Sequence, residues 1–337
     1  HLSLRRQRQM CIRDSPVDMS IELAGVRLQN PVMPASGTFG YGQEYKDVFD
    51  LNKLGALVTK SITKEPRYGN ELPRIAECTS GMLNSIGLQN PGLEHFREVD
   101  LPELRKIYRG PIVANISGFS VDEYREVAAQ VDREEQVEIL EINISCPNVD
   151  HGGSAFGSDP KLSEEITRAV RDVTKKPIFM KLTPNVLDIT EIAKACESGG
   201  ADGISLINNF KAMRIDLKTR KTITSKTYAG LSGPAIRPIA MRMVNEVSHA
   251  CKLPIIGIGG VFRVMQTNTS MTWVIALAVL VVVGIVLLLT SMAMPKFKKM
   301  QTLVDRLNLV TREILTGLPV IRAFSRERHE EERFDGA

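Results

Sequence analysis

Short apolar segments, each closed by polar residues or glycine, recur along residues 16–261. Seven of them are predicted as strands: 31–37, 56–61, 111–118, 139–148, 177–185, 203–209 and 254–260. Stretches with helical spacing lie between most of these strands, at 121–131, 161–174 and 189–200, and the last ends in a glycine pair that suits a helix stop. The alternation of strands and helices predicts parallel β/α units.

Polar side chains stand where nearly every predicted strand ends. They are Lys60, Asn115, Asn143, Ser145, Cys146, Asn148, Lys181, Asn208 and Asn209. Barrel enzymes build their sites at the carboxyl ends of their strands. The pattern therefore favours an α/β fold, a TIM-type (β/α)₈ barrel truncated before its eighth strand. A doubly wound open sheet is the alternative.

A different pattern begins after Val261. No charged residue occurs from Val264 to Pro295, and residues 272–294 form a continuous apolar run. A helix rises about 1.5 Å per residue, so this run is long enough for a bilayer core of roughly 30 Å. We expect a transmembrane helix here, with a buried core helix as the alternative. The lysines after Pro295 would place its carboxyl end in the cytoplasm.

These breaks predict three parts of the chain. Residues 1–15 are arginine-rich and form a non-native or disordered leader. Residues 16–261 form the incomplete barrel, and residues 262–337 form the transmembrane helix with a cytoplasmic helical extension.

Composition narrows the function classes. The 337 residues are 43% hydrophobic and 24% charged, with a net charge of +4. The hydrophobic and charged fractions exclude a disordered chain, a collagen-like repeat and a small disulfide scaffold. The small net charge gives no electrostatic reason to expect nucleic-acid binding. Five widely spaced cysteines without a C-x-x-C motif favour a reduced, cytoplasmic compartment for the enzyme part.

The polar residues at the strand ends limit the chemistry further. They contain no His/Asp/Glu cluster with metal-ligand spacing, and the chain has no G-x-S-x-G and no P-loop. Asparagines suit a planar ligand with donors and acceptors, and lysines suit an anionic or electron-accepting ring. Residues 257–260 (GIGG) could bring backbone N–H groups to a phosphate. Together they indicate a phosphorylated flavin and a small polar substrate.

Cys146 has two interpretations. A cysteine at a strand end is often an inert small apolar residue. Here it lies in the segment NISCPN and precedes a glycine-rich loop at 149–160. This setting favours a functional thiol beneath a loop that acts as a lid.

Seven segments also carry a family resemblance: 30–45, 80–92, 141–160, 179–189, 207–221, 230–238 and 254–261. In this order they resemble the catalytic subunit of class 1 dihydroorotate dehydrogenases. Cys146 indicates class 1, and the form NISCPNVDHGG favours subtype B.

The resemblance implies FMN-dependent oxidation of (S)-dihydroorotate to orotate in pyrimidine biosynthesis. Cys146 would take a proton from C5 while a hydride leaves C6 for N5 of FMN. The implied substrate-binding residues are Lys60, Asn84, Asn143, Asn148, Asn208 and Asn209. The implied FMN-binding residues are Ala35, Ser36, Gly37, Lys60, Asn115, Asn143, Lys181, Ile207, Ser232, Gly233, Gly259 and Gly260.

The same resemblance implies a homodimer and a separate subunit that carries FAD and a [2Fe–2S] cluster and passes electrons to NAD⁺. No metal is expected in this chain. Asn209 departs from the family's usual Thr or Ser, Ala212 stands near a usual Gly, and the family's sequence is not continued after Val261.

The residues that follow Val261 resemble a second family, the membrane domain of ABC exporters. We therefore hypothesise a chimera of an enzyme gene and a transporter gene, with the whole chain inactive as one outcome. A genuine fusion that anchors the enzyme to the membrane is the other alternative.

Overall fold

The computed structural model describes residues 18–146 and 153–259, all of which belong to the first of two units in the chain, His1–Arg263. The predicted leader, the predicted span at 272–294 and its extension lie outside the described residues. Within the described part, no helix has both the length and the apolar character needed to cross a membrane.

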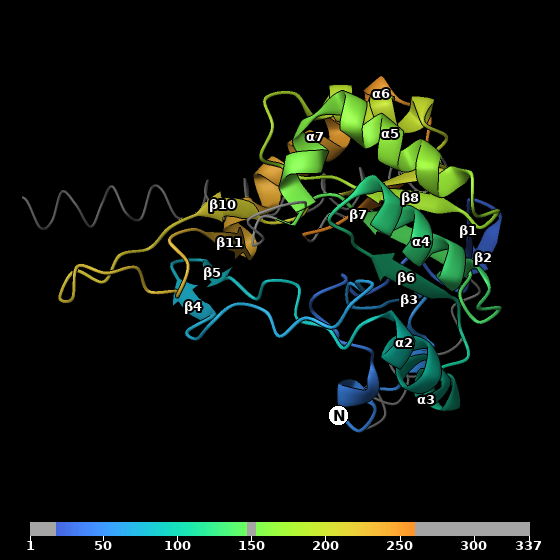
Figure 1. Cartoon of the computed structure of the whole chain (residues 1–337), viewed down its shortest axis with the longest axis horizontal. Coiled ribbons are helices and arrows are strands. Elements are labelled where there is room, and N and C mark those ends of the chain that lie inside the picture. The colour runs from blue at the N-terminus through green and yellow to red at the C-terminus, as the bar shows by residue number, and fades with distance from the viewer. Residues whose placement is uncertain (1–17, 147–152, 260–337) are drawn as a thin grey trace, which may run out of the picture. The chain divides into compact units, whose positions relative to one another are not determined.

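A curled parallel sheet forms the centre of the fold (Figure 1). Its six strands follow the order β12-β9-β8-β7-β6-β3. Their bounds are β3 Leu57–Val58, β6 Ile112–Ile116, β7 Ile139–Asn143, β8 Ile178–Lys181, β9 Gly203–Leu206 and β12 Ile255–Gly257. Six of the seven predicted strands and their parallel direction are thus confirmed.

The predicted strand at 31–37 is wrong. Pro31 and Pro34 have no backbone N–H to give to a ladder. The segment keeps one sheet-like bond, in which the Gly55 N–H donates to the Val32 carbonyl at 2.8 Å. It then turns, with the Thr38 N–H and hydroxyl both donating to the Ala35 carbonyl. This leaves the backbone of residues 35–37 available to line a cavity.

Among the described residues, the long helices all cover the outer face of this sheet. They are α4 Val121–Asp132, α5 Pro160–Arg171, α6 Ile189–Ser198 and α7 Arg237–Ala250, and the first three confirm the predicted helices. Figure 1 shows them side by side along the sheet. On β6, Ile112, Ala114 and Ile116 face the helices and join one core with Val127 and Val247. Helices on a single face indicate a TIM-type half-barrel and exclude the doubly wound alternative for this part of the chain.

Side-chain oxygens cap three of these helices. Ser120, Asp159 and Asp188 each accept a hydrogen bond from a backbone N–H in the first turn. Such caps satisfy donors that the helix leaves unpaired. At the other end of α6, Gly200 has φ +96°, a conformation that favours glycine, so the predicted glycine stop is confirmed.

The inner face of the sheet is apolar at the amino ends of the strands. A hairpin of β1 Ile21–Leu23 and β2 Val26–Leu28 packs Leu23 and Leu28 against Val58, Val113 and Phe179. The alternation along each strand then places polar side chains on the same inner face, nearer the carboxyl ends. The inner face of the sheet is therefore apolar at the amino ends of the strands and polar at their carboxyl ends.

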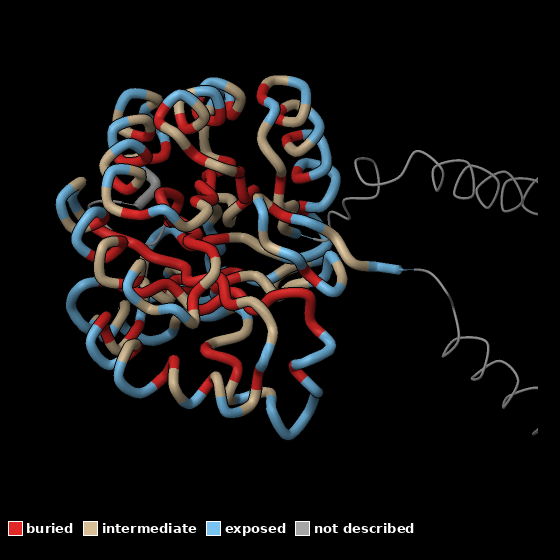
Figure 2. Tube along the Cα trace, turned by 90° about the vertical axis from the view of Figure 1, so that its right-hand side faces the viewer, coloured by how far each residue is buried: buried red, intermediate tan, exposed pale blue. Residues whose placement is uncertain are grey.

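A second, antiparallel sheet stands at the carboxyl ends of the parallel strands (Figure 1). It has the order β10-β11-β5-β4, with β4 Ile75–Cys78, β5 Gly81–Asn84, β10 Phe210–Ala212 and β11 Ala229–Ser232. Sequence analysis did not predict this sheet, nor the helical segment of α2 Leu93–His95, η3 Phe96–Asp100 and α3 Leu101–Ile107. The remaining short helices are η1 Gln43–Tyr45, η2 Leu51–Lys53, η4 Gly153–Ser158 and η5 Pro234–Ile236. Figure 2 shows the buried segments inside the layer of exposed helical surfaces.

Close packing between β8 and β9 gives a stability prediction. A Cβ atom on Gly203 would lie 2.1 Å from Cε1 of Phe179, its cross-strand partner. Gly203→Ala should therefore lower the free energy of unfolding by about 1–3 kcal/mol, as overpacking does in other cores. Urea denaturation followed by circular dichroism measures the change.

The smaller side chain in Phe179→Leu supplies the control for this contact. In the double variant, part of the overpacking cost should disappear, so the two effects should be non-additive. An unchanged midpoint for Gly203→Ala would contradict the packing described here.

Candidate active site

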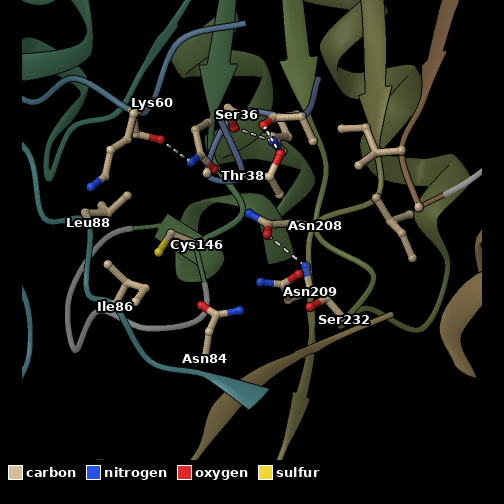
Figure 3. A pocket seen from close by; sticks show the side chains of 18 of the residues that line it. Ser36, Thr38, Lys60, Asn84, Ile86, Leu88, Cys146, Asn208, Asn209 and Ser232 are labelled. Carbon is tan, nitrogen blue, oxygen red and sulfur yellow. Dashed lines mark hydrogen bonds between the residues drawn. The ribbon is translucent and has the colours of Figure 1, made fainter. Parts of the chain in front are cut away.

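A cavity of about 460 Å³ opens at the carboxyl ends of the parallel strands, beside the antiparallel sheet. Figure 3 shows side chains that reach it from several elements, among them Lys60, Asn84, Cys146 and Asn208. The cavity brings together most of the residues predicted from the sequence. They are Ala35, Ser36, Gly37, Lys60, Asn84, Asn143, Cys146, Lys181, Ile207, Asn208, Asn209, Ser232, Gly233 and Gly259.

Three predicted site residues are not in this set. Asn115 is fully buried and does not line the cavity, although it hydrogen-bonds to Ser61, which does. Asn148 and Gly260 lie outside the described residues, as does part of the loop at 149–160 that we expect to act as a lid.

The amide groups of the cavity wall are held by an ordered series of hydrogen bonds. The Asn208 amide donates to Ser145 Oγ at 2.9 Å, and that hydroxyl donates to Asn143 Oδ1 at 2.9 Å. The Asn143 amide in turn donates to Ser61 Oγ at 2.9 Å. The Asn143 carbonyl also accepts from the buried Tyr124 hydroxyl at 2.8 Å. These bonds restrain Asn143 from both its backbone and its side chain.

The series continues into the buried interior and ends on a carboxylate. The Ser61 hydroxyl donates to Asn115 Oδ1, and the Asn115 amide donates to Glu141 Oε2. Lys181 Nζ lies 3.4 Å from the same Glu141 oxygen and donates to Ser36 Oγ at 2.7 Å. Glu141 and Lys181 are only 2% and 5% exposed. Removing one partner from such a buried pair costs about 3–5 kcal/mol, because the other charge stays buried.

Sequence analysis missed Glu141. The signal was present, because a charged residue in the apolar strand ILEIN stands two positions before Asn143 and so on the same face. A charge placed in a fully buried strand requires a partner, and Lys181 on the next strand supplies it.

Lys60 and Lys181 place two amino groups at different depths. Lys181 is buried, whereas Lys60 is partly exposed. Burial lowers the pKa of Lys60, with the Arg74 guanidinium acting in the same direction and Glu44 opposing it. The Lys60 ammonium suits an anionic ligand, and Lys181, which is paired with Glu141, suits a ring that gains electrons.

The cysteines differ sharply in their surroundings. Cys146 lines the cavity while being only 6% exposed. Cys196 and Cys251 pack in the helical core, where burial raises the pKa of Cys196 to about 12 and also raises the pKa of Cys251. Cys78 is partly exposed at the end of β4. Among these four thiols, which form no disulfide, Cys146 is the one in the cavity wall.

Apolar side chains form the remaining walls, which sequence analysis also missed. They come from Ile75, Met82, Ile86, Leu88, Ile236 and Ile258. Leu88 has φ +55° and follows Gly87 at φ +76°, so the segment turns sharply at the cavity. Arg74 fastens this turn by donating to the Asn70 and Tyr68 carbonyls and to the Gln89 side chain. No periodic sequence pattern reveals such a loop, because its position depends on the individual contacts of the Arg74 side chain.

The donors and the volume of the cavity are compatible with the flavin mononucleotide that the sequence resemblance implies. Its volume is in the range of cofactor sites, with apolar walls for a ring and amide and ammonium groups for a polar edge. A Cβ atom on Gly37 would meet no protein atom within 4 Å, so its absence leaves cavity space for a ligand. Gly233 and Gly259, both with positive φ, lie near the start of the η5–α7 helical segment, where backbone N–H groups suit a phosphate.

Comparison with known proteins decides the family. The family model for dihydroorotate dehydrogenase matches residues 18–296, well over half of the chain. The chain belongs to the dihydroorotate dehydrogenase family. It is therefore an oxidoreductase, as the resemblance in its sequence implied. The match also extends past Val261, where we expected the family's sequence to stop, and the comparisons give no evidence of an ABC exporter fragment.

Individual members of the dihydroorotate dehydrogenase family agree with this placement. The chain is 53% identical over 243 residues to the dihydroorotate dehydrogenase B (NAD(+)) catalytic subunit of Listeria welshimeri, covering 72% of this chain and 80% of that protein. It is also 53% identical to the subunit of the same name from Bacillus pumilus, covering 72% of this chain and 78% of that protein. The crystal structure of the Eimeria tenella dihydroorotate dehydrogenase in complex with ferulenol has the same fold, with a TM-score of 0.60 and 22% identity over 74% of each chain.

The cysteine environments predict an order of chemical labelling. With iodoacetamide at mildly alkaline pH, Cys78 should react first and Cys146 more slowly through the cavity. Cys196 and Cys251 should react only after denaturation, because the thiolate is the nucleophile and burial disfavours it. Peptide mass spectrometry over time measures each rate. Equal labelling of Cys196 and Cys78 in the native protein would contradict this description.

Proposed function

We propose that this chain oxidises (S)-dihydroorotate to orotate in pyrimidine biosynthesis, using FMN bound in the cavity. The observation that carries the proposal is the position of Cys146 in the wall of a cavity whose other polar side chains are amides, lysines and hydroxyls. Family membership supports the reaction class, and the sequence pattern around Cys146 supports subtype B.

Cys146 is the proposed base. Its thiolate would accept the proton from C5 of the substrate, because a thiol can reach a pKa near the operating pH of an enzyme. The cavity shields the reacting atoms from water, and the lid proposed at 149–160 would complete that shielding. Bound FMN would supply the acceptor for the hydride that leaves C6.

The amides are the proposed substrate contacts. Orotate is planar, with an imide edge and a carboxylate, and it needs donors and acceptors in fixed positions. Asn84, Asn143 and Asn208 line the cavity, and an amide side chain carries both kinds of group. Asn148 and Asn209 complete the proposed set, and the Lys60 ammonium is the proposed partner of the carboxylate.

The proposed FMN site lies in the same cavity. Lys181 and Ser36 would face the polar edge of the ring, and the backbone of Ala35 and Gly37 would lie along it. Asn115, Asn143 and Ile207 would support the ring, and Ser232, Gly233, Gly259 and Gly260 would hold the phosphate.

A second subunit is the proposed electron acceptor. The relatives from Listeria and Bacillus carry names that describe a catalytic subunit and NAD(+). By analogy, this chain would form a homodimer and pass electrons to a separate subunit with FAD and a [2Fe–2S] cluster, and from there to NAD⁺.

Replacing the proposed base tests the reaction. Cys146→Ala should lower the rate of orotate formation by at least about 100-fold, the lower end of typical general-base contributions, while FMN stays bound. Cys78→Ala serves as the matched control and should retain the wild-type rate. Orotate absorbance measures the rate, and flavin absorbance measures occupancy. Wild-type turnover in Cys146→Ala would remove this residue as the base.

The lowered pKa of Lys60 gives a pH prediction. The ammonium form favours anion binding, so orotate affinity should fall as pH rises through the lowered pKa, earlier than for an ordinary lysine. Lys60→Arg keeps the positive charge at all accessible pH values, so its affinity should decline less over the same range. Orotate titrations of both proteins between pH 7 and pH 10 compare them. Identical pH profiles would contradict a role for the Lys60 charge.

A further inference from the structure

Every link in the hydrogen-bond series behind the cavity donates in the same direction. Asn208 donates to Ser145, and Ser145 donates to Asn143. Asn143 then donates to Ser61. The direction never reverses, so each side chain uses its oxygen toward the cavity end and its proton toward the interior.

The series ends on Glu141, a group that can only accept when ionised. Ser61 donates to Asn115, which donates to the Glu141 carboxylate. An amide can rotate to exchange its oxygen and nitrogen, but a carboxylate offers no donor. The buried carboxylate at the end of the series therefore imposes the orientation of Asn115 directly. It favours the same order in Asn143 and Asn208, whose side-chain oxygens also accept from the backbone N–H groups of Ser145 and Asn209.

We propose that Glu141 is a positioning residue for the substrate site, which it does not touch. Its charge orients the amides of Asn143 and Asn208 through Ser61 and Asn115, and it balances the charge of Lys181. Charge-assisted hydrogen bonds are stronger than neutral ones, and a low-dielectric interior strengthens a connected series. This inference deepens the proposed function and rests on it for the identity of the ligand.

The amide orientation decides which ligand edge the cavity accepts. Asn143 gives its nitrogen to Ser61 and accepts at Oδ1 from both the hydroxyl and the N–H of Ser145, so it cannot turn without breaking three bonds. Asn208 likewise gives its nitrogen to Ser145 and accepts the Asn209 N–H at 2.8 Å (Figure 3). A planar ligand with donors and acceptors in fixed places needs this order in advance.

Glu141→Gln tests the inference because glutamine keeps the shape and removes the charge. Its side-chain amide can donate as well as accept, so the orientation of Asn115 is no longer imposed. We expect orotate affinity to fall about tenfold, which corresponds to the loss of one charge-assisted hydrogen bond. Glu138→Gln is the matched control: Glu138 precedes β7, pairs with Arg105 at 2.9 Å and does not line the cavity.

A ligand-free measurement separates this inference from the proposed function. In the full-length protein with asparagine side chains labelled with ¹⁵N, Glu141→Gln should shift the amide signals of Asn143 and Asn208, whereas Glu138→Gln should leave them unchanged. Ser61→Ala interrupts the series between Asn143 and Asn115 without removing the Glu141–Lys181 pair, so it should shift the same signals. The effects of Ser61→Ala and Glu141→Gln on orotate affinity should be non-additive.

The outcomes are distinct. Unchanged Asn143 and Asn208 signals in Glu141→Gln overturn the inference, whether or not the protein binds orotate. If Glu141→Gln shifts these signals but the wild-type protein binds no orotate, the orientation role is supported and the proposed function is overturned. If Glu141→Gln fails to fold, Ser61→Ala decides: shifted Asn208 signals support the series, and unshifted signals overturn it.

Discussion

The parallel register between β6, β7 and β8 is the constraint on which the site depends. It pairs Asn115 with Glu141 and Asn143 with Lys181, all on the inner face of the sheet. A slip of one residue in β7 would turn Glu141 and Asn143 into the apolar core beneath the helices. The apolar residues that determine the register of these strands therefore also place the polar chemistry of the cavity.

The same register divides the inner face of the sheet into an apolar part and a polar part along the strands. At the amino ends, Phe179 and Val113 pack on the β1–β2 hairpin and exclude water. At the carboxyl ends, the amides and Lys181 line the cavity, and Glu141 lies buried behind them. A buried charge is tolerated here because its partners come from adjacent strands in fixed geometry, which explains how an apolar fold can hold a polar site.

Much of the parallel sheet and of the cavity wall could be predicted from the sequence. Segments with an apolar run and a polar end, such as 139–148, predicted both a strand and the residues that meet in the cavity.

The wrong or missing predictions have physical reasons. Pro31 and Pro34 prevent the strand pairing that the apolar pattern at 31–37 suggested. The short strands β4, β5, β10 and β11 have little periodicity, and the pairing of β5 with β11 joins segments about 150 residues apart in sequence, such as Gly230 with Asn84. Asn115 was placed at the right strand end, but sequence spacing alone does not tell a residue that lines a cavity from one that supports it.

The most direct test of the account mixes the full-length protein, loaded with FMN, with (S)-dihydroorotate in the absence of oxygen. The visible flavin absorbance should bleach as the flavin is reduced, with orotate formed in an amount equal to the flavin reduced. A flavin that stays oxidised in the presence of excess dihydroorotate, in protein that holds FMN at full occupancy, would contradict the central claim.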